Sequence, residues 1–170
     1  NMPAHGFSRT AIFSLKSIEE LSSYKTEVTL VLKDTEGSRE LWNYKFYLEV
    51  VFIIADTLSI EMRSTNLDEN NFTLTQALHT YFNISHIKNV KVRGLEDVKY
   101  IDTLTDKVET ENKAVQINKE IDRVYQGVQN NTILEDENKS VTISSEGSSS
   151  VVVWNPWIEK GSKMSGMSKE

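Results

Sequence analysis

The sequence predicts an all-β protein, either a β-sandwich or a barrel-like sheet. Its apolar residues recur mostly with period two, which is typical of strands that bury one face, and helical spacing is scarce. Stretches rich in turn-forming residues separate these alternating runs. A length of 170 residues with 38% apolar content fits one soluble domain with a modest core. We therefore expect residues 1–170 to form a single domain.

The expected elements follow in order along the chain. The first is one helical turn over Ser17–Ser23, with Ser17 as its cap and Glu20 three residues on. Long alternating runs predict strands at Val28–Lys33, Tyr44–Phe52 and Leu58–Arg63. Shorter runs predict strands at Val90–Val92, Val115–Ile117, Val141–Ile143 and Val151–Trp154. Turn-like composition marks Asp34–Ser38, Asn66–Asn71, Gly127–Asn131, Glu135–Lys139 and Glu146–Ser150. We expect Gly161–Glu170 to be a loop or a frayed end.

Composition excludes several classes of function. The formal net charge of −6 disfavours nucleic acid and anionic lipid as partners. The absence of cysteine excludes disulfide scaffolds, thiolate zinc sites and iron–sulfur clusters, and with three histidines we expect no metal. The longest apolar run, Leu48–Leu58, is interrupted by Glu49 and Asp56 and is shorter than the roughly 20 residues of a membrane span. The first residues lack the features of a signal peptide, so we expect a cytoplasmic location and the interior of a longer chain.

The segment Phe72–Phe82 holds the candidate with the most chemistry, His79. If the segment is extended, His79 stands on a face of small and hydroxylated neighbours, where a polar ligand has room. Imidazole is the side chain best matched to proton transfer near neutral pH. The alternative is a histidine that only forms hydrogen bonds at the sheet surface, and the pattern leaves both interpretations open.

The segment Pro3–Arg9 has the composition of an irregular loop. It places two groups that can be cationic, His5 and Arg9, four residues apart. Such a loop can hold an anion, or it can be an ordinary surface turn. His86 has no partner pattern and is expected to be exposed or structural.

Two later segments hold residues that suit sugar binding. In Glu120–Tyr125, Glu120 and Asp122 share one face if the segment is extended, and a carboxylate there can accept hydrogen bonds from sugar hydroxyls or simply be solvated. The pair Trp154 and Trp157 can stack against a pyranose ring or close a core.

Taken together, five segments in order resemble the hexose-6-phosphate mutarotases, also called glucose-6-phosphate 1-epimerases, a branch of the aldose 1-epimerase group. The resemblance covers nearly the whole chain and rests on His5-Gly6-Phe7-Ser8-Arg9, Leu78–Phe82, Gly94-Leu95 with Tyr100–Asp102, Glu120–Tyr125 and Val153–Trp157. It implies the antiparallel β-supersandwich of galactose mutarotase. It also implies interconversion of the α and β anomers of a hexose 6-phosphate such as glucose 6-phosphate, by acid–base opening and closing of the ring.

The resemblance also implies roles for individual residues. His79 resembles the family's general acid, and Asp122 resembles the carboxylate that holds sugar hydroxyls near it. His5 resembles the histidine that contacts the sugar, and Arg9 resembles the arginine that helps to bind the 6-phosphate. No cofactor is implied. The expected partner is a small-molecule sugar phosphate, and we expect a monomer.

The chain departs from the family pattern at both ends. The family's general base is a glutamate in a later strand beyond residue 170, and Glu170, in a polar stretch, does not fit that role. Gly166 stands where the family usually has an aspartate. The family's first strands precede residue 1, so we expect an incomplete copy of the fold. Two rival functions stay open, a non-catalytic sugar-phosphate or carbohydrate-binding module and an aldose 1-epimerase for unphosphorylated sugars.

Overall fold

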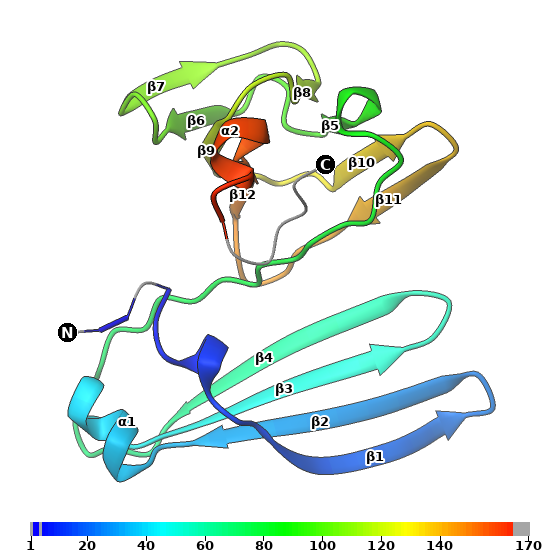
Figure 1. The fold of residues 1–170 in the computed structure, drawn as a ribbon. Helices are drawn as coiled ribbons and strands as arrows, with labels where there is room; N and C mark the ends of the chain where they lie inside the picture. The colour runs from blue at the N-terminus through cyan, green and yellow to red at the C-terminus, as the bar shows by residue number, and fades with distance from the viewer. Residues whose placement is uncertain (1, 4, 165–170) are drawn as a thin grey trace. The chain divides into compact units, whose positions relative to one another are not determined.

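The computed structural model of the chain consists of two compact units, one ending at Leu78 and the other beginning at His79 (Figure 1). The structure describes residues 2, 3 and 5–164. The regular secondary structure of both units consists mainly of antiparallel strands. Within the described residues, the helices are too short or too polar to cross a bilayer.

The first unit is a four-stranded sheet in which neighbours in sequence are neighbours in space. Its strands are β1 (Ser14–Ser22), β2 (Lys25–Lys33), β3 (Phe46–Ile54) and β4 (Leu58–Asn66). The predicted strands at Val28–Lys33, Tyr44–Phe52 and Leu58–Arg63 are confirmed by β2, β3 and β4, although β3 begins two residues late. The connection between β2 and β3 contains a short helix, α1 (Glu36–Leu41).

The expected helical turn over Ser17–Ser23 is wrong. Most of that segment lies in β1, where Ser17 pairs with Thr29 of β2. A single helical turn is costly to nucleate, whereas pairing along a long neighbouring strand satisfies the backbone groups of β1. The capping motif is found instead at Thr35 and Ser38, where each side chain accepts a hydrogen bond from the other residue's backbone N–H. The stretch expected to be a turn at Asp34–Ser38 therefore begins α1.

A hydrophobic cluster of the first unit lies on one face of its sheet. Leu32, Phe46 and Leu48 are buried there. Aromatic rings pack against this cluster, with Trp42 and Phe72 in an edge contact at 4.6 Å between ring centroids and Phe7 5.8 Å from Phe46. These contacts attach the N-terminal loop and the segment after β4 to the sheet.

The second unit is a small sandwich of two four-stranded sheets that share one core. One sheet has the order β11 (Lys139–Ile143), β10 (Thr132–Asp136), β5 (Lys91–Arg93) and β8 (Val115–Gln116). The other has the order β12 (Ser150–Asn155), β9 (Ile121–Gln126), β6 (Lys99–Asp102) and β7 (Lys107–Thr110). Val92 and Val115 from the first sheet pack with Tyr100, Tyr125 and Val153 from the second. The short helix α2 (Trp157–Gly161) follows β12, and 3-10 turns lie at Ser8–Thr10 and Ile87–Asn89.

Gly94 joins β5 to the loop that follows, and its place admits no side chain. Its φ of +84° lies in the left-handed region, and a Cβ added there would lie 2.1 Å from the backbone oxygen of Asn131. Gly127 also has a positive φ, of +71°, but a Cβ there would meet nothing within 4 Å. Substitutions at the two glycines therefore distinguish the cost of backbone strain, present at both, from the cost of steric overlap, present only at Gly94.

Gly94→Ala should lower the free energy of unfolding by about 3 kcal/mol, because overlap in a packed region costs about 1–3 kcal/mol and a left-handed non-glycine residue about 1–2 kcal/mol. Gly127→Ala should lower the free energy of unfolding by only about 1 kcal/mol, since the left-handed conformation is the only penalty at that position. Urea denaturation followed by circular dichroism measures both. Equal losses for the two variants would contradict the role of the Asn131 contact.

Candidate functional site

The imidazole of His79 lies in a small aromatic cluster at the beginning of the second unit. Its ring stacks on the ring of Tyr81, with centroids 4.9 Å apart and an interplanar angle of 28°. The ring of Trp154 meets it edge-on at 5.9 Å. His79 itself is exposed to solvent, and residues 71–84 form no strand, so His79 is placed by ring contacts and not by a sheet.

Asp122 lies beside the same tryptophan. In the antiparallel pair of β9 and β12, Asp122 stands directly opposite Trp154, so both side chains project from the same face of the sheet. The alternation of β9 agrees with this, because Ile121 and Tyr125 are buried in the core on the other face. Trp154 thus links the imidazole of His79 to the carboxylate of Asp122 in one neighbourhood of the second unit.

An ion pair of a buried arginine with a half-exposed glutamate fixes the strand that carries Asp122. The guanidinium of Arg123 is almost fully buried and donates two hydrogen bonds to the carboxylate of Glu111, at 2.9 and 3.1 Å. It also lies over the ring of Tyr100, 4.5 Å from the centroid. Burial raises the pKa of Tyr100, so its hydroxyl stays protonated and donates to Glu109 at 3.1 Å. Because Arg123 is anchored in the core, its neighbour Asp122 must point to the opposite face.

A second anchor acts on the backbone of Asp122. Its carbonyl oxygen accepts hydrogen bonds from the backbone N–H of Thr103 at 2.9 Å and from the Thr103 hydroxyl at 3.2 Å. Sequence reasoning missed Arg123, Glu111 and Thr103 as supports for the site. The signal available was the alternation itself, since it places a charged residue, Arg123, between Ile121 and Tyr125 on the buried face.

His5 and Arg9 both belong to the first unit. The backbone N–H of Gly6 donates to the oxygen of Pro3 at 3.0 Å, and His5 has a φ of +63°, a conformation that is uncommon outside glycine. Arg9 is exposed on the 3-10 turn Ser8–Thr10. Phe7, between them, packs against Phe46 and so holds the loop while the two polar side chains stay at the surface.

The remaining sequence candidates have structural partners. Glu120 forms an ion pair with Lys160 at 2.5 Å. Trp157 packs against the core of the second unit at the start of α2, unlike Trp154. The Nδ1 atom of His86 accepts a hydrogen bond from the backbone N–H of Lys88 at 3.1 Å, as expected of a structural histidine. Gly166 and Glu170 lie outside the described residues.

The described part of the chain contains no cluster of three or more histidine, aspartate or glutamate side chains that could hold a metal ion. What it does contain is an imidazole, His79, in contact with an indole, Trp154, that stands opposite a carboxylate, Asp122, in the sheet. An imidazole can donate or accept a proton, and a carboxylate beside an indole can bind the hydroxyls of a ring whose apolar face rests on the indole.

Comparison with known proteins identifies the group to which this arrangement belongs. The family model described as aldose 1-epimerase matches residues 1–170. The chain belongs to the aldose 1-epimerase family. It is 32% identical over 96% of its length to a protein of Cenchrus ciliaris and 33% identical over 91% to one of Escherichia coli strain K12, both named "Putative glucose-6-phosphate 1-epimerase". It spans about half the length of these relatives, 54% and 52%.

The fold comparison agrees with the family. The crystal structure of "a putative mutarotase (YeaD)" from Salmonella typhimurium superposes with a TM-score of 0.89 at 31% identity, covering 99% of this chain and 56% of that one. The prediction of an all-β, antiparallel fold of the galactose mutarotase type is confirmed.

The ion pair behind Asp122 predicts a dependence of stability on pH. Hydrogen bonds from Arg123 lower the pKa of Glu111 below its ordinary value of 4.5. A lowered folded-state pKa contributes stability that is present above about pH 4.5 and is lost as the pH falls through the lower, folded value. Glu111→Gln should therefore flatten the acid side of the stability curve. It should also cost about 1–2 kcal/mol at pH 7, because Glu111 is half exposed and the pair is only partly desolvated.

Urea denaturation between pH 3 and pH 7 measures this effect. Glu109→Gln is the matched control, because it removes the same charge next to Tyr100 and leaves the Arg123–Glu111 pair intact. The interpretation is wrong if the two variants give the same stability curve.

Proposed function

We propose that the protein to which this chain belongs interconverts the anomers of hexose 6-phosphates, with His79 as the general acid. One observation carries the proposal. The ring of His79 contacts Trp154, and Trp154 lies directly opposite Asp122 in the sheet. This would give a proton donor and a hydroxyl acceptor the same aromatic neighbour.

The chemistry of ring opening fits these three side chains. The ring oxygen must gain a proton as the bond from C1 breaks, and an imidazolium can supply that proton near neutral pH. Asp122 would accept hydrogen bonds from sugar hydroxyls and hold the ring in place. Trp154 offers an indole on which the apolar face of a pyranose can rest. A base outside this set would remove the proton from the C1 hydroxyl, and none of these steps calls for a cofactor.

The preference for a phosphorylated sugar depends on the N-terminal loop. The exposed guanidinium of Arg9 can form two parallel hydrogen bonds with a phosphate, and His5 on the same loop can contact the sugar. Relatives named for glucose 6-phosphate support this assignment. The family description alone, aldose 1-epimerase, fits free sugars equally well. Phosphate specificity is therefore tested through Arg9.

The proposal extends to the organisation of the protein. Because the family model matches residues 1–170 throughout, we treat the chain as a continuous part of one mutarotase domain. A monomer in the cytoplasm, binding a small sugar phosphate, completes the proposal.

His79→Asn should slow the approach of α-glucose 6-phosphate to its anomeric equilibrium by about 10²-fold, the usual loss on removing an acid catalyst. NMR exchange measures this rate in the complete protein. His86→Asn is the matched control, because it removes an exposed imidazole of the same unit that caps a 3-10 turn. A His79→Asn protein with an unchanged rate would remove His79 from the mechanism.

Arg9→Ala should raise KM for glucose 6-phosphate by about tenfold or more and change KM for free glucose little, since a charge-assisted contact is worth about 1.5–3 kcal/mol. Arg63→Ala is the control, because Arg63 is also an exposed arginine of the first unit but pairs with Glu61 at 2.7 Å. Equal losses for the two sugars would contradict the assignment of Arg9 to the phosphate.

A further inference from the structure

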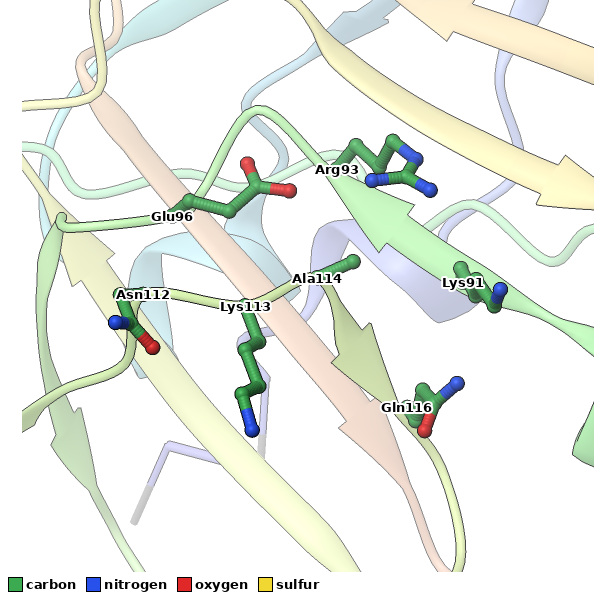
Figure 2. A pocket seen from close by; sticks show the side chains of 7 residues that line it. All are labelled: Lys91, Arg93, Glu96, Asn112, Lys113, Ala114 and Gln116. Carbon is green, nitrogen blue, oxygen red and sulfur yellow. The ribbon is translucent and has the colours of Figure 1, made fainter.

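A hollow of about 400 Å³ lies against the sheet formed by β5 and β8 in the second unit. Lys91 and Arg93 on β5 and Gln116 on β8 line it, together with Glu96, Asn112 and Lys113 from two loops (Figure 2). Lys91 and Arg93 flank the buried Val92, and Gln116 follows the buried Val115. By the alternation of strands, the hollow lies on the solvent-facing side of this sheet.

The hollow is on the opposite side of the sandwich from His79. Val92 and Val115 face the core that they share with Tyr125 and Val153 of the other sheet. Asp122 and Trp154 project from the outer face of that other sheet. A ligand in the hollow would therefore not touch the candidate catalytic residues, and the inference does not depend on the proposed function.

The lining of the hollow is basic although the chain as a whole is acidic. Three cations stand against one carboxylate in the lining and against Glu135, which pairs with Arg93 from β10, so the hollow keeps a positive excess whereas the formal net charge of the chain is −6. That carboxylate, Glu96, accepts a hydrogen bond from the backbone N–H of Gly94 at 2.6 Å, which satisfies part of its own acceptor capacity. Positive side chains gathered around a concave surface raise the local concentration of anions.

Arg93 is fixed in orientation by a carboxylate. Its Nε lies 2.7 Å from an oxygen of Glu135 on the neighbouring strand β10. A guanidinium carries five N–H donors in a rigid plane, so a contact through Nε leaves donors on its other edges for an anion. The loop walls are also held, because the backbone N–H of Asp97 donates to the oxygen of Glu111 at 2.8 Å and Gly94 contacts Asn131 closely.

We propose that this hollow binds the diphosphate group of a small phosphorylated metabolite. Lys91, Arg93 and Lys113 supply three cationic donors, enough to contact both phosphoryl groups of a diphosphate, whereas a single phosphate would use only part of them. The volume falls in the range of small-ligand sites, roughly 300–1,000 Å³, and leaves room for an organic substituent. The amides of Asn112 and Gln116 supply neutral donors and acceptors for that substituent.

Isothermal titration of the full chain with pyrophosphate tests the proposal. Saturable binding is expected, weakened about tenfold in Arg93→Gln and in Lys113→Gln, because each loses one charge-assisted contact worth about 1.5 kcal/mol. Lys107→Gln on β7 makes the same change of net charge outside the hollow and should bind as the unmodified chain does. His79→Asn should also bind normally, which separates this site from the proposed active site.

Three results would overturn the proposal. Absence of saturable binding would mean that the hollow holds no diphosphate. Equal weakening in Lys107→Gln and Lys113→Gln would show diffuse attraction by surface charge. Binding of inorganic phosphate as tight as that of pyrophosphate would contradict the assignment to a diphosphate.

Discussion

The ion pair between the buried Arg123 and Glu111 is the constraint on which the site in the second unit depends. Arg123 is the residue after Asp122, and a strand sends successive side chains to opposite faces. Once the guanidinium is held in the core by Glu111 and by the face of Tyr100, the Asp122 carboxylate has to leave the core. A slip of β9 by one residue would bury Asp122 and expose Arg123. Because an unpartnered buried charge is strongly destabilising, the ion pair selects the register that presents Asp122 beside Trp154.

The longest strands after β1 could be predicted from the sequence, because their apolar residues recur at every second position. Apolar runs located the long strands β2, β3 and β4 and, over shorter stretches, β5, β8, β11 and β12. Strands were not predicted at β6 and β10, and β9 was considered only as a segment that could be extended. The pattern also missed β1, in which Leu15 and Ile18 are largely exposed, and β7, in which all four residues are exposed. These two edge strands are defined by hydrogen bonds to one neighbour, β2 and β6 respectively. Pairing of this kind depends on the rest of the sheet and leaves little pattern in the strand itself.

The candidate site could be predicted only in part, because its geometry also depends on contacts between distant segments of the chain. Residue chemistry and motif order singled out His79, Asp122 and Trp154, and the structure shows how the three come together in the second unit. The environment of His79 was predicted on the assumption of an extended strand, and this assumption is wrong, since the segment around it forms no strand. Its placement comes from contacts with Tyr81, two residues away, and with Trp154, 75 residues along the chain. No local pattern can encode a contact with so distant a ring.

The same alternation that builds the core also gives the two outer faces of the sandwich different chemistry. On β9 and β12 the outward positions hold Asp122 and Trp154, a carboxylate and an aromatic ring suited to neutral hydroxylated ligands. On β5 the outward positions are Lys91 and Arg93, which suit anions. Both faces are fixed by the same inward residues, among them Val92, Tyr125 and Val153. A substitution in that shared core should therefore disturb both faces, whereas an outward substitution on one sheet leaves the other face intact.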